Sequence, residues 1–131
     1  MEPPSVRDYT LFNSQLANLD RALALERVGG DTELLQEVAR LFLDDCPNAM
    51  AMIRNAVEAG DPKALERAAH NLKGAVANFG AEATVHAALQ LEEIGRSGRM
   101  EEVAAAFQTL EAALDRLTPE LTALADETPA V

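Results

Sequence analysis

Apolar residues recur every three or four positions along most of the chain, which is the period of an amphipathic helix. The first long series, over residues 31–59, consists of Leu35, Val38, Phe42, Cys46, Ala49, Ile53 and Val57. The second, from residue 103, consists of Val103, Phe107, Leu110, Leu114, Leu117, Leu121 and Leu124. Pro47 is expected to kink the first helix without ending it, because the apolar period resumes beyond it, and Pro119 to bend or shorten the second.

Glycine and proline breaks divide the chain into five predicted helices. These are a short helix from Ser14 or Asp20 to Val28, and longer helices over residues 31–59, 62–79, 81–96 and 103 to about 125. Since short connections make neighbouring helices antiparallel, the predicted fold is all-α, an up-down-up-down four-helix bundle with an additional short N-terminal helix across one end. One domain is expected over residues 14–125, with a flexible N-terminal arm over 1–13 and a C-terminal tail over 126–131.

Composition limits the size and the partners of this bundle. At 131 residues there is room for one hydrophobic core, and the few aromatic residues (4 %) favour close-packed helices over a sheet. The net charge of -11 repels phosphate backbones and anionic lipid, which argues against nucleic acid and membrane partners. No apolar run approaches the roughly 18 residues that span a bilayer. With a single cysteine, Cys46, and no secretion signal in residues 1–9, the cytoplasm is the expected location.

The predicted helix over residues 62–79 presents a histidine on its polar side. Its apolar stripe consists of Leu65, Ala68, Leu72, Val76 and Phe79. At about 100° per residue, His70 falls roughly 160° from the middle of that stripe. We therefore expect the imidazole to point to solvent and not into the core.

Cations and small residues surround this histidine. The only two lysines of the chain, Lys63 and Lys73, lie on this helix with Arg67, although the protein as a whole is acidic. Gly74 follows His70 by one turn, and a glycine inside a helix costs about 1 kcal/mol relative to alanine. Such a glycine is expected where something must approach the backbone closely, and Ala77 keeps the next turn open in the same way.

An exposed imidazole with a cationic fringe and an open approach is typical of phosphoryl transfer. A neutral imidazole is a good nucleophile near neutral pH. Lys73 can neutralise charge on the transferring group. The chain has neither a phosphate-binding loop nor the glycine-rich lid of a kinase. It is therefore expected to receive phosphate from another protein, as a phosphotransfer intermediate without ATP-dependent kinase activity and not as an independent enzyme.

Other candidate residues have simpler interpretations. His86 shares a polar arc with Gln90 and Glu93 and has no Lys-Gly one turn later, so it is interpreted as an incidental surface histidine. Two histidines without a cysteine cluster do not make a metal site, and no cofactor is expected. The Cys46 thiol is expected to be buried and inert. Met50 and Met52 are expected to pack in or near the core.

The segment from His70 to Gly80 resembles the histidine-containing phosphotransfer (HPt) family of two-component phosphorelays. It follows the pattern of His, any residue, an apolar residue, Lys, Gly, Ser or Ala, and a small residue, with Gly ten positions after the His. The stretch over residues 22–31, followed by Leu34-Leu35, is similar to the first helix and turn of the family. The likeness covers about residues 19–118.

The resemblance implies roles for particular residues. His70 would be phosphorylated at Nε2 and exchange phosphate with an aspartate of a receiver domain, with Lys73 supporting the phosphate and Gly74 permitting close approach. Family members often have a polar residue, commonly glutamine, on the next helix that steadies the ring, and the matching residue here is Glu92. An acid there can accept from Nδ1 but also favours the protonated ring over the neutral nucleophile, and Arg96, one turn on, can pair with it and soften that effect.

The resemblance also implies partners. These are response-regulator receiver domains, which would carry the Mg²⁺ themselves, and a hybrid sensor histidine kinase. A monomer is expected, and the Met1 start favours a free-standing protein over a module of a larger kinase. Leu23, Val28 and Phe79 either contribute to an apolar docking patch or belong to the core at the end of the bundle. The alternative function is a non-transferring adaptor that binds and inhibits a receiver or a kinase.

Overall fold

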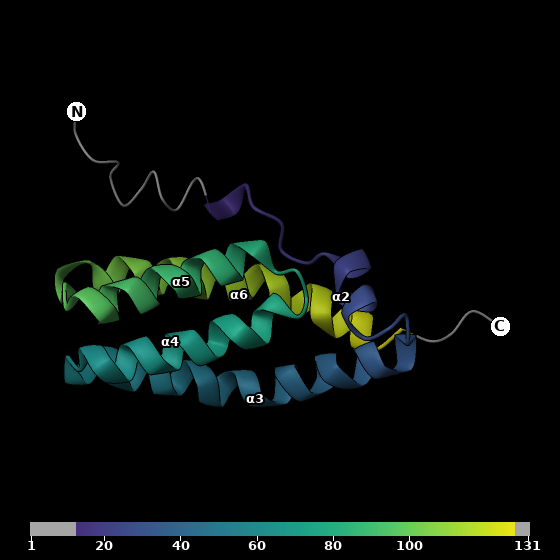
Figure 1. Cartoon of the computed structure of the whole chain (residues 1–131), viewed down its shortest axis with the longest axis horizontal. Helices are drawn as coiled ribbons and strands as arrows, with labels where there is room; N and C mark the ends of the chain where they lie inside the picture. The colour runs from purple at the N-terminus through teal and green to yellow at the C-terminus, as the bar shows by residue number, and fades with distance from the viewer. Residues whose placement is uncertain (1–12, 128–131) are drawn as a thin grey trace.

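The computed structural model describes residues 13–127, and over this range the chain is helical without a strand (Figure 1). Its elements are α2 (Arg21–Arg27), α3 (Thr32–Ala59), α4 (Pro62–Ala77), α5 (Glu82–Ser97), the 3₁₀ turn η1 (Met100–Glu102) and α6 (Val103–Ala125). The four long helices lie side by side with alternating chain direction, and α2 lies at the end of the bundle where α3 begins and α6 ends. The predicted all-α antiparallel four-helix bundle with a short extra helix is confirmed.

Local chemistry sets the helix boundaries. Asp20, Asp31 and Asp61 are N-caps of α2, α3 and α4, and each side chain accepts a hydrogen bond from the backbone N–H three residues on. Such caps satisfy an N–H that has no partner within the helix. Gly60 ends α3 in the left-handed conformation that glycine adopts without strain (φ 62°).

Both prolines lie inside continuous helices. α3 runs through Pro47, as predicted, and α6 runs through Pro119 to its predicted end at Ala125, so Pro119 does not shorten the last helix. Leu117 and Leu121, on either side of Pro119, are fully buried. This burial offsets the backbone hydrogen bond that proline cannot donate.

The helix of the histidine ends two residues earlier than the periodicity predicts. α4 stops at Ala77, and residues 78–81 form the turn to α5, with Gly80 at φ 58°. Phe79, in this turn, is 1 % exposed and packs edge-to-face on Phe42, with ring centroids 5.5 Å apart. The turn therefore belongs to the core of the bundle.

Part of the predicted N-terminal arm packs on the bundle. Asn13 is buried, and its side-chain amide donates to the backbone oxygen of Ala83 at 2.8 Å and accepts from Arg116 at 3.1 Å. The rest of the predicted arm, residues 1–12, and residues 128–131 of the predicted tail lie outside the described residues. Glu127 forms an ion pair with Arg21, which joins the end of the described chain to α2.

No helix within residues 13–127 has the length and hydropathy to cross a membrane.

Candidate functional site

The apolar stripe of α4 faces the core as predicted. Its predicted members in α4, together with Ala69, are at most 6 % exposed. The side chain of His70, on the other side of this helix, is 64 % exposed. The interpretation of a buried, structurally satisfied histidine is therefore excluded by the geometry.

The imidazole contacts a buried carboxylate from the neighbouring helix. Oε2 of Glu92, on α5, lies 2.8 Å from Nδ1 of His70. The side chain of Glu92 is only 3 % exposed. The predicted contact between these two residues is present, and it fixes the ring from one edge.

Two cations neutralise this carboxylate. Lys73 Nζ donates to Glu92 Oε1 at 2.5 Å, and Arg96 Nη2 donates to Glu92 Oε2 at 3.3 Å. Arg96 also bonds Glu66 on α4, with Nε to Oε2 at 3.0 Å. The hydrogen bond from Lys73, then that from His70, lower the pKa of Glu92 although burial opposes them. Glu92 is therefore ionised at neutral pH.

The ionised carboxylate determines the tautomer of the ring. A carboxylate can only accept hydrogen bonds, so the proton of the neutral His70 ring lies on Nδ1, which faces Glu92. The lone pair is then on Nε2, at the other edge of a largely exposed side chain. The unprotonated nitrogen of the neutral ring is therefore the one that faces away from Glu92.

The approach to this nitrogen is open at Gly74. A Cβ placed on Gly74 would meet nothing within 4 Å, so no packing contact within this protein requires a glycine there. Ala77, one turn further, is half-buried.

The comparisons with known proteins identify the family. The family model of the Hpt domain matches residues 37–120, more than half of the chain. This chain belongs to the Hpt domain family. The crystal structure of histidine-containing phosphotransfer protein B (HptB) from Pseudomonas aeruginosa PAO1 has the same fold, with a TM-score of 0.79 at 21 % identity, over 86 % of this chain and 97 % of that chain. Comparison with the curated proteins found no match.

The family assignment confirms the resemblance predicted from the segment that begins at His70. Hpt domains act in two-component phosphorelays, where they interact with response regulators and kinases. In this Hpt domain the imidazole of His70, on α4, is largely exposed.

The remaining predicted cations, Lys63 and Arg67, have no described ion pair with the carboxylate beside His70. Both residues are exposed on α4. Arg67 lines a groove towards α3, with Met52 and Asn71. Lys73 and Arg96, by contrast, contact the carboxylate that holds the ring.

The apolar docking patch proposed from Leu23, Val28 and Phe79 is not supported for Phe79, which is buried in the core of this Hpt domain. Leu23 and Val28 are half-buried beside it. The large apolar side chains that are exposed within residues 13–127 lie on α3 instead: Leu34, Leu41 and Met52. Met52, at 59 % exposure, is thus not in the core, which corrects the expectation from its place in the sequence.

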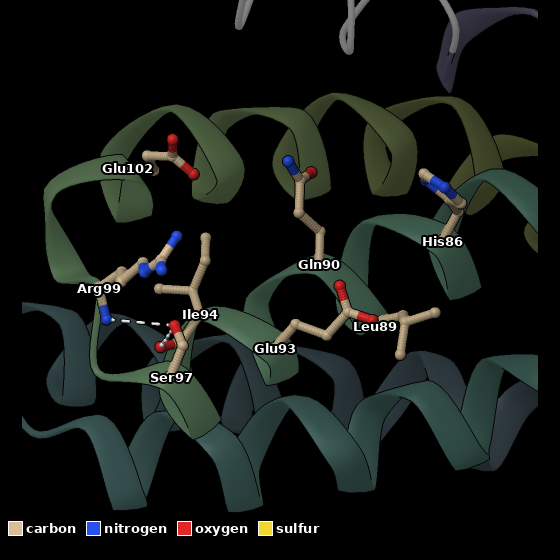
Figure 2. A pocket seen from close by; sticks show the side chains of 8 residues that line it. All are labelled: His86, Leu89, Gln90, Glu93, Ile94, Ser97, Arg99 and Glu102. Atoms are coloured by element: carbon tan, nitrogen blue, oxygen red, sulfur yellow. Dashed lines mark hydrogen bonds between the residues drawn. The ribbon is translucent and has the colours of Figure 1, made fainter. Parts of the chain in front are cut away.

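A pocket on the other side of α5 contains the second histidine. Figure 2 shows His86 at one end of this pocket and Arg99 and Glu102 at the other, with Gln90 and Glu93 between them. No group of three or more potential metal ligands occurs among residues 13–127. The pocket has neither the Lys-Gly pair nor the buried carboxylate of the His70 site.

Cys46 differs from its predicted state. It is half-buried in α3 and lines a groove between α3 and α4, so the expectation of a fully buried thiol is wrong. Partial burial, and then the neighbouring carboxylate of Asp45, raise the pKa of the Cys46 thiol. A raised pKa disfavours the reactive thiolate, which agrees with an inert role.

Two residues of the site were missed from the sequence. Glu66 completes the bridge to Arg96, and Gly95 lies in the contact between α4 and α5. Glu66 could have been found from the sequence, because it lies one helical turn before His70 on the same predicted helix. The signal for Gly95 was a glycine inside a predicted helix, the same feature that singled out Gly74.

Proposed function

We propose that this Hpt domain carries a phosphoryl group on Nε2 of His70 between aspartates of two receiver domains. The observation that carries the proposal is an exposed imidazole whose Nδ1 is held by a buried, ionised carboxylate. This arrangement supports a nucleophile that is oriented within the protein and accessible from outside.

In the first transfer, the Nε2 lone pair attacks the phosphorus of an aspartyl phosphate in line. The bond between phosphorus and the aspartate oxygen breaks, the electron pair leaves with the carboxylate, and an N–P bond forms. The ring keeps its Nδ1 proton and becomes positively charged. Glu92, 2.8 Å away, stabilises that charge as it develops. In the second transfer, an aspartate oxygen of another receiver attacks phosphorus, and the N–P electron pair returns to the ring.

Lys73 would supply charge neutralisation for the phosphoryl group. In the unphosphorylated protein its ammonium is bound to Glu92, and its side chain is 27 % exposed. To reach a phosphoryl oxygen it exchanges that contact for the new one, and Arg96 stays on the carboxylate. The Mg²⁺ for the reaction belongs to the receiver, so the proposed function needs no cofactor on this chain.

The proposed partners are response-regulator receiver domains and a hybrid sensor histidine kinase. The proposed location is the cytoplasm, and the proposed state is a monomer. Lys63 and Arg67 would guide docking of an acidic receiver pocket against the overall negative charge.

The test is phosphotransfer from a radiolabelled, phosphorylated receiver. The wild-type protein should acquire an acid-labile, base-stable label, and His70→Gln should acquire none, since the nucleophile is removed. His86→Gln is the matched control and should label like the wild type, because His86 lies on the other side of α5.

The second candidate is a non-transferring adaptor that binds a receiver or a kinase. It predicts that the wild-type protein binds receivers and acquires no label from any of them. The combined presence of His70, Lys73 and Gly74 favours the carrier, because an adaptor does not require these three together.

A further inference from the structure

The backbones of α4 and α5 are in close contact at a glycine one turn from the site. A Cβ on Gly95 would lie 2.6 Å from the backbone nitrogen of Glu66 and 2.6 Å from the backbone oxygen of Pro62. Both atoms belong to the first turn of α4, so neither can rotate away like the end of a side chain. Glycine is therefore required for this helix spacing.

This contact and the contact between the ring and the carboxylate belong to one helix interface. Glu92 precedes Gly95 by three positions on α5, and His70 follows Glu66 by four positions on α4. In antiparallel helices these steps run in the same direction, and each is about one turn, or roughly 5 Å along the axis. The spacing at Gly95 therefore sets how far Glu92 lies from His70.

The polar contacts of the site have little tolerance for a wider spacing. The bonds of Glu92 to His70 and Arg96 measure 2.8 and 3.3 Å. A Cβ at residue 95 would need roughly 1 Å more room to reach ordinary van der Waals distance. A hydrogen bond of 2.8 Å that lengthens by that amount is no longer a hydrogen bond.

We propose that Gly95 is a positioning residue for phosphoryl transfer: it lets α4 and α5 touch, and thereby holds Glu92 against Nδ1 of His70. The inference rests on the proposed function for its effect on the reaction rate. Its effect on the ring does not depend on that function, because the tautomer of His70 can be measured in the unphosphorylated protein.

The first measurement is the ¹⁵N NMR spectrum of the histidine rings at alkaline pH. The wild-type protein should show His70 with the proton on Nδ1, and Gly95→Ala should shift it to a mixture of tautomers. Gly74→Ala is the matched control for this readout and should keep the wild-type spectrum, since its Cβ meets nothing. An unchanged tautomer in folded Gly95→Ala would overturn the proposal.

The second measurement is the rate of label transfer, combined with a double-mutant cycle. Gly95→Ala should slow transfer by about 10- to 100-fold, the range expected when a catalytic group is displaced by about 1 Å. In the background of Glu92→Gln, Gly95→Ala should slow transfer by less than about 3-fold, because the contact it positions is already changed. An equal loss in both backgrounds would show that Gly95 acts on the fold in general and would reject the positioning role.

A third variant covers the case in which Gly95→Ala does not fold. Glu92→Asp withdraws the carboxylate by one methylene and leaves the contact at Gly95 intact. It should shift the tautomer and slow transfer as Gly95→Ala does, whereas a wild-type tautomer and rate would show that spacing does not matter. If the wild-type protein acquires no label while its ring shows the Nδ1 proton, the proposed function fails and the positioning role stands.

Discussion

The two glycines near His70 lie in opposite environments. Gly95 lies in the interface between α4 and α5, here called the seam, and a Cβ there would lie 2.6 Å from backbone atoms of α4. Gly74 lies on the exposed side of α4, here called the open face, and a Cβ there would meet nothing within 4 Å. The seam contains the buried carboxylate that holds Nδ1, and the open face is where Nε2 is accessible. One edge of the ring is fixed by the protein and the other is free for a partner.

This difference shows how one side chain can be both oriented and exposed. Orientation requires rigid neighbours, and these lie on α5, where Glu92 is buried with its cations. Access requires the absence of neighbours, which Gly74 provides. If the distinction between the two regions is correct, substitutions in each should affect different properties.

Apart from the substitutions of His70 and Gly95 described above, the largest effect is expected at Lys73, where the two regions meet. Lys73→Ala should slow phosphoryl transfer by at least ~10-fold, because it removes the cation that faces the developing charge. Transfer of label from a phosphorylated receiver measures this rate. Arg99→Ala is the matched control and should stay within ~2-fold, since this exposed cation lines the pocket on the other side of α5. A loss of helical content in Lys73→Ala would show instead that its main role is in the seam.

A smaller effect on transfer, together with a gain in stability, is expected for a substitution on the open face. Gly74→Ala should raise the free energy of unfolding by about 0.5 to 1 kcal/mol, because alanine favours an exposed helix interior and the new methyl group meets nothing. The same methyl group would intrude on a docked receiver and should slow transfer several-fold. Chemical denaturation and transfer rates measured on one preparation test both parts. Lower stability, or faster transfer, would contradict the assignment of this face to a partner.

The smallest effect is expected for Glu92, in the seam, and concerns how the unfolding free energy depends on pH. The pKa of Glu92 is lowered in the folded protein, first by Lys73. A carboxyl group of this kind stabilises the fold above its unfolded pKa, about 4.3 for glutamate, and this contribution is lost as the pH falls through the lower folded value. In Glu92→Gln, the decline of the unfolding free energy below about pH 4.3 should be shallower than in the wild type.

Denaturation at a series of pH values from 7 to 3 measures this difference. Glu93→Gln is the matched control, because Glu93 is the neighbouring acid outside the network and is exposed. It should keep the wild-type slope. If both variants gave the same slope, the buried carboxylate would not be held by the cations of the seam.

Much of the fold follows from local patterns. The period of the apolar residues, together with the glycine and proline breaks, located the four long helices, and α4 starts at Pro62 as predicted. Where tertiary packing competes with such patterns, the prediction failed. Phe79 continues the apolar stripe of α4 but lies in the turn that follows, where its ring packs on Phe42 of α3.

For the site, the sequence alone determined that His70 points away from the core with Lys73 and Gly74 one turn away, because positions on one helix are related by a fixed rotation. Only the tertiary structure decided that Glu92 is buried against Nδ1, that Lys73 is bound to that carboxylate, and that Gly95 touches the backbone of α4. These contacts depend on the distance and relative rotation of two helices. That arrangement results from the packing of the whole bundle and is not encoded in the period of either helix.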